Sequence, residues 1–285
     1  MKVVVTGANG QLGRALIASK PLAVECVGVV RTMCDLSVEA EVKAFLQKER
    51  PDIIINSGAY TAVDLAETDA RAATLVNADS VGVMRAELQK TGGQLIQIST
   101  DFVFDGSSAK AYIPSDRPNP ISVYGHTKAA GEVSAGPEAL IVRTSGVYAA
   151  GGKNFVRTML QLMRERDELR VVNDQISAPT WATGLAEVIW SLSRLKAKGV
   201  FHHRDAGVAS WYDFALAIQE EAIGLGMLNR AVPVVPISTD QYPTPAKRPA
   251  FSLLNDVDTR RLLGDKCQHW RVNLRKMLKE EREIV

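Results

Sequence analysis

The side chains best suited to acid–base chemistry are a tyrosine and a lysine four residues apart, Tyr124 and Lys128. Residues i and i+4 lie on one face of an α-helix, and Ser122 can cap a helix that begins beside it. A free tyrosine has a pKa of about 10, and an adjacent ammonium group lowers this pKa by stabilising the phenolate. The spacing therefore predicts an acid–base centre in which Lys128 adjusts the pKa of Tyr124.

Two hydroxyl groups could hold a substrate against this phenol. Ser99 and Thr100 directly follow the apolar run 95–98, so we expect them at the end of a strand. A carbonyl held between Thr100 and Tyr124 would be suited to reduction by a nicotinamide cofactor, and the corresponding alcohol to oxidation. A lone Tyr-x-x-x-Lys pattern is also common on ordinary helix surfaces. The interpretation therefore requires a dinucleotide site elsewhere in the chain.

A glycine-rich loop near the start of the chain indicates such a site. A β-branched run predicts a buried strand over 1–6, and a helix is expected over 14–18. Between them lie Gly7, Gly10 and Gly13. Strand, glycine loop and helix in this order are typical of dinucleotide binding, because glycines let the backbone approach the pyrophosphate and the helix N-terminus favours an anion. The alternative is a tight turn that binds nothing.

The residue after the second predicted strand bears on the choice of cofactor. Proteins that prefer NAD usually place an acidic residue there, where it binds the ribose hydroxyls. This chain has Arg31 after a strand predicted over 24–30, and an arginine suits the 2′-phosphate of NADPH. The alternative is an exposed loop arginine, so NADPH is favoured and NADH stays open. Asp35 and Leu36 follow and could flank the adenine.

Strands and helices alternate along most of the chain, which predicts an α/β fold with a Rossmann-like, doubly wound parallel sheet. Strands are predicted over 1–6, 24–30, 52–56, 94–98, 140–144 and 199–202, and helices over 14–18, 37–49, 63–90, 155–164 and 181–195. The long helical region should break near Asn77 or Asp79.

Two parts are expected. Residues 1–150, rejoined by 181–205, should form an NADP-binding Rossmann domain, and 151–180 with 206–285 a smaller substrate-binding domain. Five prolines between 233 and 249 predict loops in that second part.

The composition excludes several classes of protein. The 285 residues carry a net charge of +2, too balanced to predict binding to nucleic acid or a membrane surface. No apolar run is long enough to span a bilayer. Three cysteines without CxxC spacing and four scattered histidines predict neither a disulfide framework nor a metal site. A reducing cytoplasm is the expected location.

Beyond these motifs, the chain resembles the extended short-chain dehydrogenases/reductases, and within them the dTDP-4-dehydrorhamnose reductases. The matching blocks are 100–106 (TDFVFDG), 124–128 (YGHTK), 143–145 (RTS), 173–175 (NDQ), 178–180 (APT), 242–245 (YPTP), 248–249 (RP) and 252–255 (SLLN). They run through nearly the whole chain and are more specific than the Tyr/Lys pair. The resemblance implies NADPH-dependent reduction of the C4 carbonyl of dTDP-4-dehydro-6-deoxy-L-mannose to dTDP-L-rhamnose.

The resemblance also implies roles for individual residues. Tyr124 would donate the proton, and Lys128 would lower its pKa and bind the nicotinamide ribose. The catalytic set would be Thr100, Tyr124 and Lys128. The implied cofactor-binding residues are Gly7, Gly10, Gln11, Leu12, Gly13, Arg31, Asp35, Leu36, Gly58, Ala59 and Tyr60, together with Tyr124 and Lys128. The implied substrate-binding residues are Thr100, Asp101, Phe102, Asn173, Gln175 and Arg248.

Three positions depart from the pattern of the family. Phe102 stands where many members have a tyrosine, and Gly146 where many have a tryptophan over the sugar. These two changes leave open a ketoreductase or epimerase for another nucleotide-deoxysugar. Ala15 replaces a glutamate of the magnesium-linked dimers, so a monomer or weak homodimer is expected. A non-catalytic regulatory subunit, as in the methionine adenosyltransferase β subunit, is the alternative from another class.

Overall fold

The computed structural model describes residues 1–264 and 267–284. Its centre is a six-stranded sheet in which every neighbouring pair of strands is parallel. In spatial order the strands are β10 (Gly199–His202), β5 (Leu140–Thr144), β4 (Gln94–Thr100), β3 (Ile53–Asn56), β1 (Lys2–Thr6) and β2 (Glu25–Val29). The predicted α/β fold with a doubly wound parallel sheet is confirmed.

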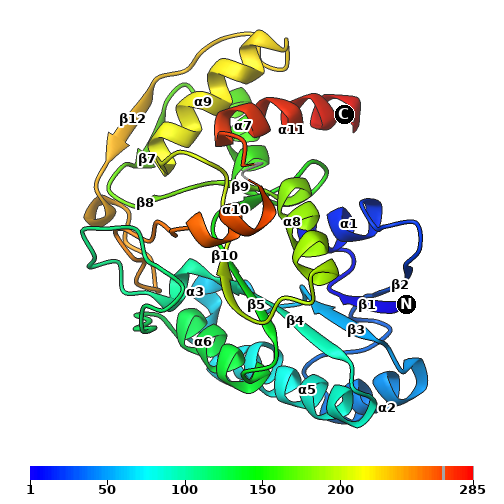
Figure 1. Cartoon of the computed structure of the whole chain (residues 1–285). Helices are drawn as coiled ribbons and strands as arrows, with labels where there is room; N and C mark the ends of the chain where they lie inside the picture. Colours follow the sequence, from blue (N-terminus) through cyan, green and yellow to red (C-terminus); the bar gives the residue numbers. More distant parts are fainter. Residues whose placement is uncertain (265–266, 285) are drawn as a thin grey trace.

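Helices cover both faces of this sheet (Figure 1). One face carries α1 (Gln11–Ala18) and α8 (Ala182–Arg194), and the other carries α2 (Glu39–Glu49), α5 (Ser80–Thr91) and α6 (Val123–Ala135). Successive strand residues point to opposite faces, so Val3 and Val5 join the core under α1 and α8, whereas Val4 joins the core on the other side. Burial on both faces explains the continuous apolar runs of the strands.

The long helical region after β3 is interrupted, as the sequence predicts. It consists of α3 (Val63–Ala66), α4 (Ala70–Thr74), a turn of π-helix, η1 (Leu75–Asp79), and α5. The π turn contains both Asn77 and Asp79, the two positions named for the break. Helix α6 packs directly on it: a Cβ atom added to Gly131 would lie only 2.0 Å from the carbonyl oxygen of Asn77.

A second apolar core lies beyond the carboxyl ends of the main strands, around Tyr148, Phe214 and Trp270. Figure 1 shows β7, β12, α7, α9 and α11 gathered there. The elements are β6 (Val147–Tyr148), α7 (Phe155–Glu165), β7 (Leu169–Val172), β8 (Ile176–Ser177), β9 (Thr180–Trp181), β11 (Ala209–Ser210), α9 (Trp211–Gly224), β12 (Val234–Ile237) and α11 (Trp270–Ile284). Three short helices, η2 (Asp101–Val103), η3 (Thr239–Gln241) and α10 (Val257–Leu263), lie outside this core.

The expectation of loops around the late prolines is wrong at one of them. Pro236 lies inside β12, which pairs in parallel with β7 to form a two-stranded sheet. Such a strand has one unpaired edge, and a proline without an N–H group is tolerated at an edge. The regular structure of α9, α10 and α11 was also not predicted, although α11 buries Trp270, Leu274 and Leu278 at helical spacing.

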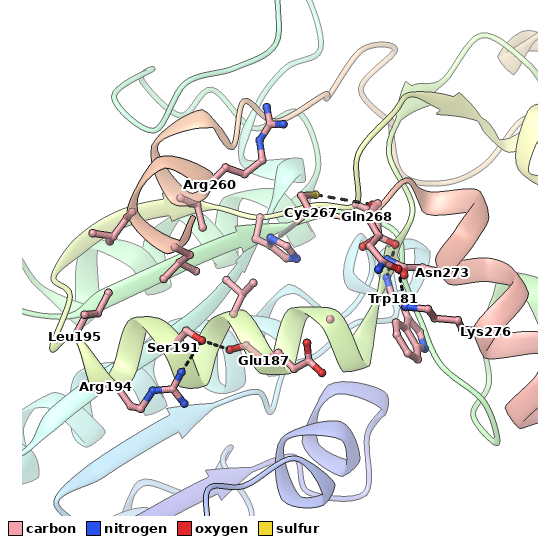
Figure 2. Close-up of a pocket in the computed structure, with 17 residues that line it drawn as sticks. Trp181, Glu187, Ser191, Arg194, Leu195, Arg260, Cys267, Gln268, Asn273 and Lys276 are labelled. Atoms are coloured by element: carbon pink, nitrogen blue, oxygen red, sulfur yellow. Dashed lines mark hydrogen bonds between the residues drawn. The ribbon is translucent and has the colours of Figure 1, made fainter. Parts of the chain in front are cut away.

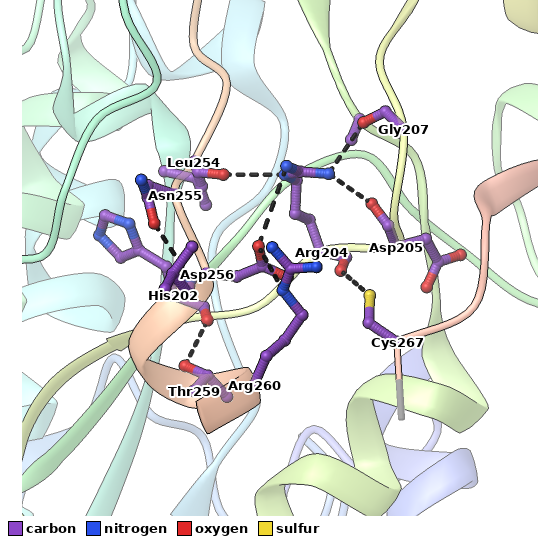
Figure 3. Close-up of polar contacts among 12 residues, drawn as sticks. His202, Arg204, Asp205, Gly207, Leu254, Asn255, Asp256, Thr259, Arg260 and Cys267 are labelled. Atoms are coloured by element: carbon purple, nitrogen blue, oxygen red, sulfur yellow. Dashed lines mark hydrogen bonds and ion pairs between the residues drawn. The ribbon is translucent and has the colours of Figure 1, made fainter. Parts of the chain in front are cut away.

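The chain before α10 is fastened to the end of β10 (Figure 3). Arg204 donates to the carbonyl oxygens of Leu254 and Gly207, both at 2.8 Å, and its other amine lies 3.8 Å from Asp256. Thr259 donates to the carbonyl oxygen of His202 at 2.6 Å. These contacts hold the segment before α10 at the sheet edge where the carboxyl ends of β4 and β5 lie.

Candidate active site

The predicted helix around the Tyr/Lys pair is confirmed as α6. Ser122 caps it by accepting a hydrogen bond from the N–H of Gly125 at 3.2 Å. Tyr124 and Lys128 follow one helical turn apart, and Lys128 is buried. Its Nζ donates to the carbonyl oxygen of Ile98 at 2.6 Å, so the ammonium group is fixed at the end of β4. Burial lowers the pKa of Lys128 to about 8.

Tyr124 lies half-buried against the residues that follow β4. Burial raises the pKa of its phenol to about 12, and a hydrogen bond from the Thr100 hydroxyl opposes that rise. The ring of Phe102 meets the Tyr124 ring edge-on, with centroids 5.7 Å apart. This pKa corrects the sequence-based expectation that Lys128 lowers it. In the structure the amine of Lys128 is bonded to a backbone carbonyl, and loss of water around the phenol dominates.

Asp101 is a further acidic group beside the phenol, and its side chain is buried. Its carboxylate accepts hydrogen bonds from Thr100 and Ser252. Burial nevertheless raises its pKa to about 6. Ser252 comes from the segment that Arg204 fastens to the sheet edge, and the sequence analysis did not assign it to the site. The structure thus brings Thr100, Asp101 and Tyr124 together at the end of β4.

The glycine loop between β1 and α1 has no room for side chains. Gly7 has a φ of +64°, and a Cβ there would lie 2.7 Å from the Cα of Gly58. A Cβ on Gly13 would lie 2.2 Å from the carbonyl oxygen of Gly7. Gly10 precedes α1 without a side-chain cap, and the first turn of α1 contains no acidic residue. The helix N-terminus therefore offers backbone N–H groups, including those near Gln11 and Leu12, to an anion. The loop fits a dinucleotide.

Four of the other predicted cofactor residues follow β2 and β3, on either side of the same loop. Arg31 follows β2, and its guanidinium is mostly exposed although it donates to Asp35 at 2.9 Å. The pKa of Asp35 is lowered mainly by hydrogen bonds from Ser37. A Cβ on Gly58 would meet the side chain of Leu36 at 2.7 Å. The ends of β1, β2 and β3 thus converge where open α/β sheets bind ligands.

The segment of Gly58, Ala59 and Tyr60 is held by a residue that sequence analysis named only as a helix break. The Asn77 amide accepts from the N–H of Tyr60 at 2.8 Å and donates to its carbonyl oxygen at 3.2 Å. It also donates to the Thr127 hydroxyl on α6 at 3.0 Å. Asn77 thus links the predicted cofactor segment to the catalytic helix.

The predicted substrate residues of the second part are engaged with the protein. Gln175 donates to Thr239 at 3.1 Å and accepts from the indole of Trp211 at 3.2 Å. Arg248 forms a two-pronged ion pair with Asp64, at 3.1 and 2.8 Å. Asn173 is exposed at the end of β7.

Backbone pairing connects this group to the catalytic end of β4. The N–H of Ile176 donates to Ala250 at 2.7 Å, and the N–H of Ser252 donates to Ile176 at 2.9 Å. The same Ser252 donates its hydroxyl to Asp101. The residues next to Gln175 and Arg248 therefore lie beside the acid–base centre.

A pocket of about 520 Å³ lies elsewhere, on the α8 face of the sheet (Figure 2). Its described walls come from 181–195, 203–205, 259–263 and 267–276. Figure 2 shows Glu187 and Ser191 on α8 and, at the other end of the view, Gln268 and Asn273 at α11. The pocket is thus separate from Tyr124 and from the glycine loop.

The comparison with known families identifies the chain. A family model described as the RmlD substrate binding domain matches residues 1–283. The chain belongs to this family. The RmlD-family match extends to individual proteins: the dTDP-4-dehydrorhamnose reductase of Burkholderia thailandensis is 40% identical over 285 residues, which cover 95% of this chain and 96% of that protein. The resemblance drawn from the sequence is confirmed.

Solved structures of RmlD-family proteins have the same fold. The dTDP-4-dehydrorhamnose reductase of Clostridium acetobutylicum superposes with a TM-score of 0.93 at 36% identity, over 99% of this chain and all of that one. The enzyme of Bacillus anthracis, solved in complex with NADP, gives a TM-score of 0.91 at 35% identity, over 98% of this chain and 99% of that one.

Proposed function

We propose that the chain reduces the C4 keto group of dTDP-4-dehydro-6-deoxy-L-mannose to give dTDP-L-rhamnose, with NADPH as the cofactor. The observation that carries this proposal is the meeting of Thr100 and Tyr124 at the end of β4, beside a glycine loop that fits a dinucleotide. Family membership and the NADP complex of the Bacillus anthracis enzyme support it.

The chain's own residues supply the proton and the orientation. Bound NADPH supplies the hydride that adds to C4. Tyr124 gives its phenolic proton to the oxygen at C4, so the alcohol forms without a free alkoxide. A pKa raised to about 12 keeps this phenol protonated at neutral pH, which suits a proton donor. Thr100 holds the carbonyl oxygen against the phenol, and Lys128, whose amine is fixed at the Ile98 carbonyl, would bind the nicotinamide ribose.

Several finer assignments belong to the same proposal. Gly7, Gly10 to Gly13, Arg31 and Gly58 to Tyr60 would line the cofactor. Asp101 and Phe102 would contact the sugar. Asn173, Gln175 and Arg248 would contact the nucleotide diphosphate. The core around Phe214 and Trp270 is separate from the two cores that flank the sheet, and this supports a division into an NADP-binding part, 1–150 with 181–205, and a substrate-binding part, 151–180 with 206–285, although Tyr148 and Trp181 of the first part also join that core.

Assembly and location also stay predictions. A monomer or weak homodimer is expected, and light scattering across a concentration series tests it. Within the described residues, no helix combines the length and the apolar character that crossing a bilayer requires. A cytoplasmic location rests on the cysteine pattern of the sequence.

The decisive experiment mixes the pure protein with NADPH and the dTDP-4-keto-6-deoxy sugar and follows the absorbance of the reduced cofactor. Turnover is expected in the native protein, and Tyr124→Phe should lower kcat by about 10²- to 10⁴-fold because the general acid is lost. The affinity of this variant for NADPH should stay within about twofold of wild type. A native protein that oxidises no NADPH would refute the proposal.

A second candidate, a ketoreductase for a different deoxysugar, is favoured by Phe102 and Gly146. Gly146 has a φ of +52°, a conformation that a tryptophan rarely adopts, so an aromatic wall at this position is disfavoured by the backbone. NMR of the product decides between the two candidates through the configuration at C4.

A further inference from the structure

A buried ion pair lies beneath the proposed catalytic lysine. Glu132 sits on α6 one turn beyond Lys128, and both side chains are buried. Arg143 of β5 donates to the two carboxylate oxygens of Glu132 at 2.8 and 2.7 Å, and Ser99 donates to the same carboxylate at 2.5 Å. Three donors thus hold a charged group that the reaction itself does not use.

The guanidinium of Arg143 also makes contacts on the side away from Glu132. Its guanidinium lies 5.1 Å from the centre of the Phe104 ring and 3.3 Å from Nε2 of His202. Burial and the charge of Arg143 lower the pKa of His202 to about 3, so this imidazole is neutral at physiological pH. Nδ1 of His202 lies 3.1 Å from the Tyr112 carbonyl oxygen, which leaves Nε2 to accept from the arginine. The pair is therefore held in one geometry.

Two features connect this pair to Lys128. Ser99, which donates to Glu132, directly follows Ile98, whose carbonyl oxygen accepts from Lys128. The strand end that receives the ammonium group is thus anchored to the carboxylate. Burial lowers the pKa of Lys128, and the negative charge of Glu132 opposes that shift.

Other charged groups surround the helix. Those on the elements packed against α6 are Asp64 and Glu67 at α3, Arg71 on α4, Asp79 on η1, Arg85, Glu87 and Lys90 on α5, and Asp101 on η2. Among the side chains that the structure describes, Glu132 is the one whose charge acts on Lys128, while Asp101 acts on Tyr124.

We propose that Glu132, clamped by Arg143 and Ser99, is a positioning residue that keeps Lys128 at the carbonyl of Ile98 and in its ammonium form. This inference rests on the proposed reductase function. It assigns the Glu132–Arg143 pair a task in the chemistry beyond holding α6 on the sheet, because a buried ion pair contributes little to stability by itself.

The first test is the pH profile of kcat/KM, which reports ionisations of the free enzyme. Activity should fall with rising pH as Lys128 loses its proton. In Glu132→Gln this alkaline limb should move down by about one pH unit, because the negative charge that favours the ammonium is gone. Glu132→Asp should restore part of the shift. Glu221→Gln is the matched control, since Glu221 pairs with Arg271 and Arg275 far from the site and its loss should leave the limb in place.

The second test is independent of turnover. The pKa of Lys128 is measured by NMR of its ¹³Cε resonance, assigned by its absence in Lys128→Met. A lower pKa in Glu132→Gln supports the inference even if the native protein rejects the proposed sugar. Active native protein with an unmoved Lys128 pKa in this variant overturns the inference and leaves the reductase function standing.

Glu132→Gln leaves Arg143 buried without its partner, and the variant could fail to fold. The double variant Glu132→Gln/Arg143→Gln removes both charges and keeps hydrogen-bonding groups at both positions. It should still show a lower pKa of Lys128 than wild type. A double variant whose Lys128 titrates as in wild type would reduce the pair to a structural contact and end the proposal.

Discussion

Ser252 donates its hydroxyl to the carboxylate of Asp101, although 151 residues separate the two in the chain. Through this bond, a residue from the last part of the sequence joins the proposed acid–base centre. Asp101 is buried and its pKa is raised to about 6 from 3.8, so this carboxyl should contribute a measurable pH dependence.

Asp101→Asn should change how stability depends on pH. The native protein binds the Asp101 proton more tightly than the unfolded chain does. The stabilisation that comes from the proton on Asp101 is therefore complete below pH 3.8 and is lost as the pH rises through about 6. The asparagine variant lacks this loss. Relative to wild type, its free energy of unfolding should gain about 3 kcal/mol between about pH 4 and pH 8, measured by urea titration. A difference that is the same at both pH values would contradict the assignment.

Arg31→Ala should discriminate between the two nicotinamide cofactors. If the exposed guanidinium binds the 2′-phosphate, the dissociation constant for NADPH should rise by roughly 10- to 100-fold, as expected for a charge-assisted hydrogen bond. The constant for NADH should change by less than about threefold. Lys43→Ala, which removes an exposed cation on α2, is the control. Equal effects on both cofactors would show that Arg31 is an exposed loop residue that does not bind the 2′-phosphate.

Arg248 and Asp64 should have opposite effects on binding of dTDP. Arg248→Ala should weaken dTDP by roughly 10- to 100-fold and leave thymidine, which has no phosphate, nearly unaffected. Asp64→Asn should tighten dTDP, because the carboxylate that now occupies the guanidinium no longer competes. Titration calorimetry measures all four combinations. Weaker binding in both variants would show that the ion pair shapes the loop and does not compete with phosphate.

Asn77→Ala should damage both the fold and the cofactor site. The amide makes three hydrogen bonds, of which the one to Thr127 is buried, and their loss leaves the N–H of Tyr60 without its acceptor. The free energy of unfolding should fall by about 2–3 kcal/mol, with weaker binding of NADPH. Thr127→Val removes the bond from Asn77 to α6, together with the bond that the Thr127 hydroxyl donates to the carbonyl oxygen of Tyr124, and should cost about 1–2 kcal/mol with little effect on the cofactor. Thermal unfolding and fluorescence titration of NADPH measure the two effects.

Local patterns predicted the parts of the site that lie close together in the chain. The i, i+4 spacing of Tyr124 and Lys128, the cap at Ser122 and the glycine loop each depend on a few neighbouring residues, and α6 and α1 follow from them. The sheet followed from the alternation of β-branched runs with amphipathic stretches.

Contacts between distant segments could not be predicted in this way. Nothing near Ser252 indicates that it reaches Asp101, because that contact depends on how Arg204 fastens the residues after Ser252, at Leu254 and Asp256. The pKa of Tyr124 was misjudged for a similar reason. Spacing places Lys128 beside the phenol, but only the packed structure shows that its amine bonds to the Ile98 carbonyl and that burial raises the pKa of the phenol.

Gly131 decides how closely α6 approaches the π turn η1. With no side chain there, α6 rests on the π turn that carries Asn77, and Asn77 in turn holds the segment proposed to line the cofactor. One added methyl group at this position would push α6, which carries Tyr124, away from that segment. The missing side chain of Gly131 thus affects the distance between Tyr124 and the segment proposed to line the cofactor, although Gly131 is not among the residues proposed to contact a ligand.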